Sequence, residues 1–263
     1  SYADLLRASA SVAGTLLDGA EDLKEARDAS LIPASLEYVA AHWGVWRAGG
    51  IAVPHSLGAA EPEREHVVTD AGVRAVLASR PLRGRIEPLC RRRGIRLLCV
   101  EDTLGTETSA LPRVASERPA MILYTSGTTS KPKGVVTTHG NIEAQITSLV
   151  EAWGWREDDR IPLFLPLHHV HGIVNVLGCA LWSGAFVEAF ESFDLDDGTG
   201  NLTSFGTSVA AGTAPNALAS DPGGIHVFAL GATSDDVTTF ARDPMTGALT
   251  AVGAPGAAGT TPS

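Results

Sequence analysis

Residues 124–134 read YTSGTTSKPKG, with five serine and threonine hydroxyls, two glycines and two lysines. The apolar run 120–123 before this segment predicts a short buried strand, and the β-branched residues 135–138 after it predict a second one. Glycine, serine and threonine are also typical of flexible linkers. A segment held between two strands cannot move as a linker does, so we expect a short loop that joins two strands.

The chemistry of this loop suits an anion. Its two glycines let backbone N–H groups approach a ligand closely, its hydroxyls add hydrogen-bond donors, and its two lysines add positive charge. A polar hairpin loop without a ligand is the alternative interpretation. The loop is not a Walker loop, because the string G-x-x-x-x-G-K-[ST] does not occur in the sequence.

The string YTSGTTSKPKG resembles the phosphate-binding signature of the adenylate-forming superfamily, which includes acyl-CoA synthetases, luciferases and the adenylation domains of peptide synthetases. The resemblance implies that the loop encloses the β- and γ-phosphates of ATP, and that Mg2+ and CoA also take part. The implied phosphate-binding residues are Thr125, Ser126, Gly127, Thr128, Thr129, Lys131, Lys133 and Gly134.

Helical and strand-like patterns alternate on both sides of the loop, which predicts a layered α/β domain. Ser35 is a plausible N-cap for a helix that buries Trp43 and Trp46, and Gly49 would end it. The string 31–54 resembles the early part of acyl-CoA synthetases. The predicted helices are 35–48, 83–93 and 141–153, the predicted strands are 49–54, 75–78 and 95–100, and 101–118 is predicted as loop.

Three histidines, His168, His169 and His171, follow an apolar stretch, 161–165, that predicts a strand. A metal site is one interpretation, and histidines hydrogen-bonded at a strand end are another. On an extended segment, His169 and His171 share one face and His168 takes the other. No carboxylate or cysteine lies nearby to complete a ligand set, so we predict no metal site.

The string PLHHVHG, 166–172, resembles the second core motif of acid–CoA ligases. That resemblance implies that His169 is catalytic and lies at the carboxylate to be activated. His171 matches a further histidine of malonyl-CoA synthetases, which faces the second carboxylate of the diacid. Both histidines are therefore implied substrate-binding residues. The arginine that binds the distal carboxylate in those enzymes lies further along than the part this chain matches.

Composition limits the partners. The 263 residues carry 20 basic and 30 acidic side chains, a net charge of −10, which argues against binding to nucleic acid or to a membrane surface. An arginine cluster at 91–93 predicts the solvated face of a helix, with a basic patch as the alternative. Three cysteines without metal spacing suit a reducing compartment, and we expect a cytoplasmic location.

No apolar run is long enough for a membrane-spanning helix, and no signal peptide opens the chain. The sequence begins with Ser1 inside a helical pattern. We therefore expect that the true start is missing.

The family resemblance covers about residues 2–192, and the sequence then repeats itself. Residues 193–216 match 240–263 at 12 of 24 positions, at an offset of 47 residues. A period in the forties with strand-like segments is typical of β-propeller blades, and the repeat resembles the bacterial lactonase-like propeller family. About one and a half blades are present, whereas a propeller typically needs 4–8. Two families joined within a domain indicate a chimeric or fragmentary reading frame, with a natural or designed fusion as the alternative.

These observations predict an α/β chain with two parts: a truncated AMP-binding domain at 1–192 and an all-β, propeller-like tail at 193–263. The function implied by resemblance is that of an ATP-dependent acid–CoA ligase acting on a small carboxylic acid, with malonate favoured. We expect this chain to be inactive alone. The alternative is a propeller-type scaffold or lactonase-like protein with a degenerate nucleotide-binding leader.

Overall fold

The computed structural model describes residues 1–105, 110–125 and 131–189, and the backbone of eight strands within 190–263. The chain divides into two compact units, Ser1–Glu191 and Ser192–Ser263. The first unit contains both the 124–134 loop and the three histidines.

The first unit is built on a six-stranded sheet. In spatial order its strands are β4 (Arg96–Cys99), β3 (Val73–Ala78), β1 (Arg27–Leu31), β2 (Ile51–Pro54), β5 (Pro119–Thr125) and β6 (Lys133–Thr138). All are parallel to their neighbours except β6, which runs antiparallel to β5. All four residues of β2 are buried, as expected for a parallel strand covered on both faces. The α/β class is confirmed.

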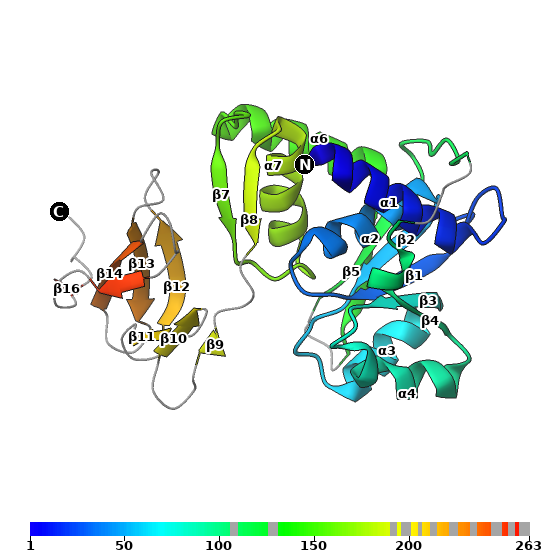
Figure 1. Cartoon of the computed structure of the whole chain (residues 1–263), viewed down its shortest axis with the longest axis horizontal. Coiled ribbons are helices and arrows are strands. Elements are labelled where there is room, and N and C mark those ends of the chain that lie inside the picture. Colours follow the sequence, from blue (N-terminus) through cyan, green and yellow to red (C-terminus); the bar gives the residue numbers. More distant parts are fainter. Residues whose placement is uncertain are drawn as a thin grey trace. The chain divides into compact units, whose positions relative to one another are not determined.

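Helices cover both faces of this sheet (Figure 1). The chain crosses from β1 to β2 in one direction and from β2 back past β1 to β3 in the other. Right-handed crossovers therefore place successive helices on opposite faces. Helices α1 (Tyr2–Leu17) and α2 (Leu36–Arg47) contribute to one buried core, and α3 (Glu61–Asp70) and α4 (Arg83–Arg93) contribute to the other.

A smaller parallel pair of strands completes the first unit. Helix α6 (His139–Trp153) leads to β7 (Arg160–Leu163), and a π-helix, η1 (His171–Gly178), runs into α7 (Cys179–Ser183) before β8 (Phe186–Ala189). Strands β7 and β8 pair in parallel.

Most predicted elements are present, with several corrections. Helices 35–48, 83–93 and 141–153 correspond to α2, α4 and α6, and Ser35 caps α2 by accepting a hydrogen bond from the backbone of Tyr38. The spacing of apolar residues in 35–48 predicts that Leu36 faces the core, but its side chain is 45% exposed. Strand β1 and helix α3 were not predicted, and the predicted loop 101–118 begins inside a short helix, α5 (Val100–Thr103).

The arginines of α4 pair with acidic side chains instead of forming a free basic patch. Arg92 contacts Glu61 at 2.6 Å and Arg93 contacts Glu65 at 2.7 Å, both on α3, while Arg91 pairs with Glu87. The prediction of a solvated helix face is therefore confirmed, and its acidic partners come from the neighbouring helix as well as from α4.

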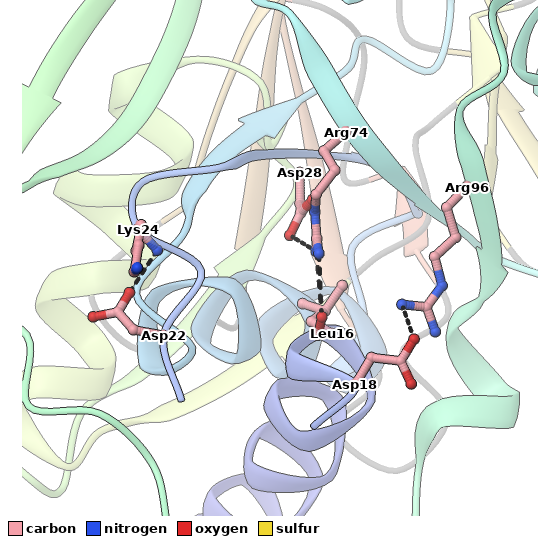
Figure 2. Close-up of polar contacts among 7 residues, drawn as sticks. All are labelled: Leu16, Asp18, Asp22, Lys24, Asp28, Arg74 and Arg96. Carbon is pink, nitrogen blue, oxygen red and sulfur yellow. Dashed lines mark hydrogen bonds and ion pairs between the residues drawn. The ribbon is translucent and has the colours of Figure 1, made fainter. Parts of the chain in front are cut away.

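Arg74 on β3 links β1 to the C-terminal end of α1 (Figure 2). Its guanidinium lies 2.9 Å and 3.1 Å from the carboxylate oxygens of Asp28 on β1, and it also donates to the carbonyl oxygen of Leu16 at the end of α1. The Asp28 side chain is fully buried. Burial outweighs the arginine and raises the Asp28 pKa. The carboxylate therefore depends on Arg74 for its main compensating charge.

A second arginine anchors the start of β5, the strand that leads into the 124–134 loop. Arg118, immediately before β5, donates to both carboxylate oxygens of Asp22 and to the carbonyl oxygen of Gly49 at 2.6 Å. Gly49 has φ +80°, and a Cβ there would lie 2.3 Å from the Asp22 carboxylate. Glycine is thus required at position 49 for two reasons: the backbone there is left-handed, and a side chain would displace the Asp22 carboxylate from Arg118.

Buried His42 gives the first prediction. It lies on α2 between Tyr38 and Trp46, and neither ring nitrogen has a hydrogen-bond partner among the described residues. Burial lowers the His42 pKa to about 3, with His139 adding to the effect. The folded protein therefore keeps this ring neutral, whereas the unfolded chain takes up a proton near its ordinary pKa of 6.5. The stability that depends on neutral His42 is full above pH 6.5 and is lost as the pH falls toward 3.

Below pH 6.5 the wild-type protein should lose unfolding free energy as the pH falls, because its unfolded chain binds one more proton than the folded one at residue 42. His42→Leu removes that proton, so we expect its unfolding free energy to fall less steeply, by about 1.4 kcal/mol per pH unit. Urea unfolding at pH 7 and pH 4.5 measures this change. The control is His171→Leu at an exposed histidine. Equal pH slopes for wild type and His42→Leu would contradict the prediction.

The second unit consists of antiparallel strands. One sheet has the order β11-β10-β9, with bounds Thr207–Ala210, Asn201–Ser204 and Asp194–Leu195. The other has the order β12-β13-β14-β15, with β16 beside β14. Their bounds are Pro215–Ser220, His226–Gly231, Asp236–Arg242, Leu249–Ala251 and Gly256–Ala257.

Strand pairing in this unit follows the 47-residue repeat. Leu202 pairs with Leu195 in the first copy, and Leu249 pairs with Arg242 at the equivalent positions of the second. The next pairs, Thr203 with Asp194 and Thr250 with Ala241, are equivalent too. The copies differ at their ends, because β11 pairs with β10 whereas β16 pairs with β14.

Candidate functional site

The loop identified in the sequence joins two neighbouring strands of the main sheet. Thr125 is the last residue of β5, Lys133 is the first of β6, and the two residues pair directly. Thr125, Lys131, Lys133 and Gly134 are exposed. The predicted site residues Ser126, Gly127, Thr128 and Thr129 lie outside the described residues. The loop is a connection within the sheet, and the linker interpretation is wrong.

Gly134 has a packing role. A Cβ at this position would lie 2.9 Å from the Ile122 side chain and 3.2 Å from the ring of Tyr124, both on the facing strand. A side chain at 134 would therefore push β6 away from β5. This explanation was not apparent from the sequence, which indicated only close approach of the backbone to a ligand.

Helix α3 contacts both ends of the loop. The Nε2 atom of His66 lies 2.8 Å from the carbonyl oxygen of Pro132, and the hydroxyl of Tyr124 donates to Asp70 at 2.7 Å. Sequence reasoning missed His66 and Asp70, because no local pattern links a charged helix to a loop more than 50 residues away.

The three histidines lie on a turn and at the start of a helix, so the extended arrangement predicted for them is wrong. Strand β7 ends at Leu163, and the backbone N–H of His169 donates to the carbonyl oxygen of Pro166 across a turn. The rings of His168 and His169 lie 4.1 Å apart between centroids. Burial lowers the pKa of His168 to about 4, and His169 adds to the effect. His169 itself is exposed.

His171 begins the π-helix and is held by a polar chain. Its Nδ1 lies 3.0 Å from the amide nitrogen of Asn175, whose oxygen accepts from Gln145 on α6 at 2.5 Å. Since an amide nitrogen only donates, Nδ1 accepts, and a neutral ring carries its proton on Nε2. A Cβ on Gly172 would lie 2.6 Å from the carbonyl oxygen of Pro166, so this glycine lets the helix pack on the turn. π-helical turns are rare and are frequent at functional sites.

Helix α2 connects the two candidate segments. Trp46 donates to the carbonyl oxygen of Ala120 in β5 at 2.7 Å, and Tyr38 donates to that of Leu167, next to His168, at 2.8 Å. Trp43 and Trp46 pack against the core, as predicted. Within the described part of the chain, no hydrogen bond or ring contact joins His169 or His171 to the residues of the 124–134 loop.

Among the described residues, no group of three or more histidine, cysteine or acidic side chains could hold a metal ion. No helix in that part of the chain has the length and apolarity to span a membrane.

Comparisons with known proteins bear on both units. The family profile for AMP-binding enzymes matches residues 1–215, and a profile for lactonases with a seven-bladed β-propeller matches residues 188–262. The mitochondrial malonate–CoA ligase of Homo sapiens is 42% identical over 171 residues, which are 62% of this chain and 30% of that protein. A malonate–CoA ligase of Arabidopsis thaliana is 35% identical over 190 residues, 68% of this chain and 31% of the relative.

Solved structures show the same similarity. ATP-bound MatB from Rhodopseudomonas palustris superimposes with a TM-score of 0.66 at 26% identity, over 74% of this chain and 41% of that one. The N-terminal domain of FACL13 from Mycobacterium tuberculosis gives a TM-score of 0.66 at 26% identity, over 74% of this chain and 51% of that one. The matched segment thus spans about a third of the length of these curated relatives.

Proposed function

Because the chain belongs to the family of AMP-binding enzymes, we propose that its first unit is the phosphate-binding part of an ATP-dependent acid–CoA ligase that activates malonate. The observation that carries this proposal is the 124–134 loop, placed between β5 and β6 in a chain that is 42% identical to a malonate–CoA ligase. Ligands of open α/β sheets bind outside the carboxyl ends of parallel strands, and this loop begins at such an end.

The loop would hold the β- and γ-phosphates of ATP. Its hydroxyls, backbone N–H groups and lysines offer donors and positive charge where pyrophosphate leaves, and such groups act by stabilising charge that develops in the transition state. The residues proposed for this role are Thr125, Ser126, Gly127, Thr128, Thr129, Lys131, Lys133 and Gly134.

His169 and His171 would bind the acid. The exposed ring of His169 is free to meet a carboxylate, whose oxygen attacks the α-phosphorus of ATP and displaces pyrophosphate. The thiol of CoA then attacks the acyl carbonyl, and AMP leaves. His171 presents its Nε2–H, because Asn175 occupies the other nitrogen. It can therefore donate to the second carboxylate of malonate.

Magnesium fits this part of the chain only as an ion carried by the nucleotide. The described residues form no three-ligand cluster, and Mg2+ at phosphate sites commonly keeps several waters and binds through phosphates and one or two carboxylates. No step proposed for these residues depends on the ion.

Grafting tests the proposal. Residues 1–189 joined to the portion of the human malonate–CoA ligase that follows its matching segment should catalyse malonate-dependent ATP–pyrophosphate exchange. A folded graft that exchanges no pyrophosphate with any short acid would contradict the proposal. The unaltered human enzyme is the positive control.

Selectivity gives a second prediction for the same graft. We expect kcat/KM for malonate to exceed those for acetate and octanoate, because an apolar acyl site would make little use of a second polar histidine. His171→Leu should lower the malonate value by about tenfold or more, the effect of one hydrogen bond to a charged group, and should change the acetate value little. Faster turnover of octanoate than of malonate would leave the family standing and overturn the malonate assignment.

The second unit favours a separate origin. We propose a boundary at 192/193, supported by the lactonase profile match and by the repeated strand register. A propeller-type scaffold is the alternative function, and it requires further 47-residue repeats. Independent DNA reads across codons 185–200 and past codon 263 decide between a genuine fusion and a joining error.

The proposed compartment is the cytoplasm. Its support is that Cys90, Cys99 and Cys179 are all free and buried, which suits a reducing environment.

A further inference from the structure

Helix α3 is firmly attached to the body of the first unit. Val67 and Val68 are buried in the core shared with α4. Glu61 and Glu65 form ion pairs with arginines of α4. The helix is therefore a fixed support for whatever its other side chains contact.

Two of those side chains contact the two described ends of the phosphate loop. His66 reaches Pro132, between Lys131 and Lys133, with 2.8 Å from Nε2 to the carbonyl oxygen. Asp70, one helical turn further on, accepts from the hydroxyl of Tyr124 at 2.7 Å, next to Thr125. The rings of His66 and Tyr124 also meet edge to face, 6.0 Å apart.

Little else in the described structure covers this end of the hairpin. Val135 and Val136 follow the loop on β6 and point to opposite faces of the strand, yet they are 49% and 55% exposed. Packing on either face of β6 is therefore too slight to fix the position of Lys133. The contacts from α3 supply polar restraints that this packing does not.

We propose that His66 and Asp70 are positioning residues of the phosphate loop: α3 fixes both ends of the loop through Pro132 and Tyr124, and so sets where Lys131 and Lys133 meet phosphate. A carbonyl oxygen only accepts, so Nε2 of His66 carries a hydrogen. Neutral and protonated rings both satisfy this contact. His66 therefore acts by holding the Pro132 carbonyl in place. A glutamine at position 66, which keeps an N–H donor, should be able to do the same.

The test uses the whole 263-residue chain and four variants: His66→Leu, His66→Gln, Tyr124→Phe and the control Glu63→Gln, an exposed residue of the same helix. Amide hydrogen exchange at Lys133 and Gly134 reports the loop end, and exchange at Ala29 and Val76 in the buried sheet reports the fold. Titration with millimolar inorganic pyrophosphate reports phosphate binding.

We expect His66→Leu and Tyr124→Phe each to speed exchange at Lys133 and Gly134 about fivefold, the effect of losing one hydrogen bond, and to weaken pyrophosphate binding by a similar factor. His66→Gln and Glu63→Gln should stay within twofold of wild type. If His66→Leu also speeds exchange at Ala29 and Val76, that variant has lost the fold. The nearly isosteric Tyr124→Phe then tests whether the loop contact alone controls exchange at Lys133 and Gly134. Exchange within twofold of wild type in the folded variants would overturn the inference.

The inference rests on the proposed function only for the identity of the ligand, and the two can fail separately. If the variants exchange faster but the wild-type chain binds no pyrophosphate, His66 and Asp70 still position the loop and the phosphate assignment is rejected. If the wild-type chain binds pyrophosphate but the variants exchange at the wild-type rate, the positioning role is rejected and the phosphate assignment stands.

Discussion

Changing Lys133 and Thr128 together to alanine in the grafted enzyme is expected to lower malonate-dependent ATP–pyrophosphate exchange by about 10³-fold or more. Removing one preorganised donor from a developing charge typically lowers kcat by about 10²–10³-fold, and two donors to one group do not add independently. Lys133 begins β6 and is paired with Thr125 at the mouth of the loop, where the contacts from α3 to Pro132 and Tyr124 also restrain the backbone.

The matched control is Lys24→Ala, which removes the one lysine of the chain that lies outside the loop. It should leave exchange within about twofold of the unaltered graft. If the double variant retained a tenth or more of the exchange rate, the loop would not be the phosphate site, whatever the fate of the histidine assignments.

Arg74→Met is expected to lower the free energy of unfolding of the first unit by about 3 kcal/mol. Removing one partner of a buried ion pair typically costs about 3–5 kcal/mol, because the other charge stays buried without compensation. We expect the lower end of this range, since the Arg74 side chain is 38% exposed whereas Asp28 is fully buried. Loss of the contact to Leu16 at the end of α1 contributes to the same effect.

Urea unfolding measures this change, with an unaltered m-value expected. Adding Asp28→Asn to Arg74→Met should recover part of the loss, because a neutral amide needs no countercharge. The control Arg91→Met breaks an exposed pair within α4 and should cost less than about 1 kcal/mol. A cost for Arg74→Met no greater than that of the control would show that Asp28 needs no partner.

The sequence allowed prediction of elements whose local pattern is strong. Three such elements are present: the apolar strand before the loop, the β-branched strand after it and the helix capped by Ser35. Each has a clear residue pattern together with residues that mark where the element begins or ends. Helix α3 has the sequence EPEREHVVTD, with too few apolar residues for a visible stripe, because only its two valines and Arg64 are buried. Strand β1 is short, and a charged Asp28 interrupts its apolar pattern.

The site was predicted in part. The loop could be found because its glycines, hydroxyls and lysines are the residue types that bind anions. Its contacts with His66 and Asp70 could not be found, because they depend on tertiary packing that the local sequence does not encode. The histidines were expected on an extended segment because the preceding residues are apolar. The structure places them on a turn leading into a π-helix, where Gly172 permits close packing on Pro166.

The central claim is that this chain holds the phosphate-binding part of an acid–CoA ligase and needs the part that its relatives add. The most direct test is release of AMP by the purified 263-residue chain and by the graft, each with ATP, CoA and malonate, and each without malonate. We predict malonate-dependent AMP from the graft and none from the chain alone, whose affinity for ATP should be no tighter than millimolar. Malonate-dependent AMP from the monodisperse chain alone, or none from a folded graft, would contradict the account.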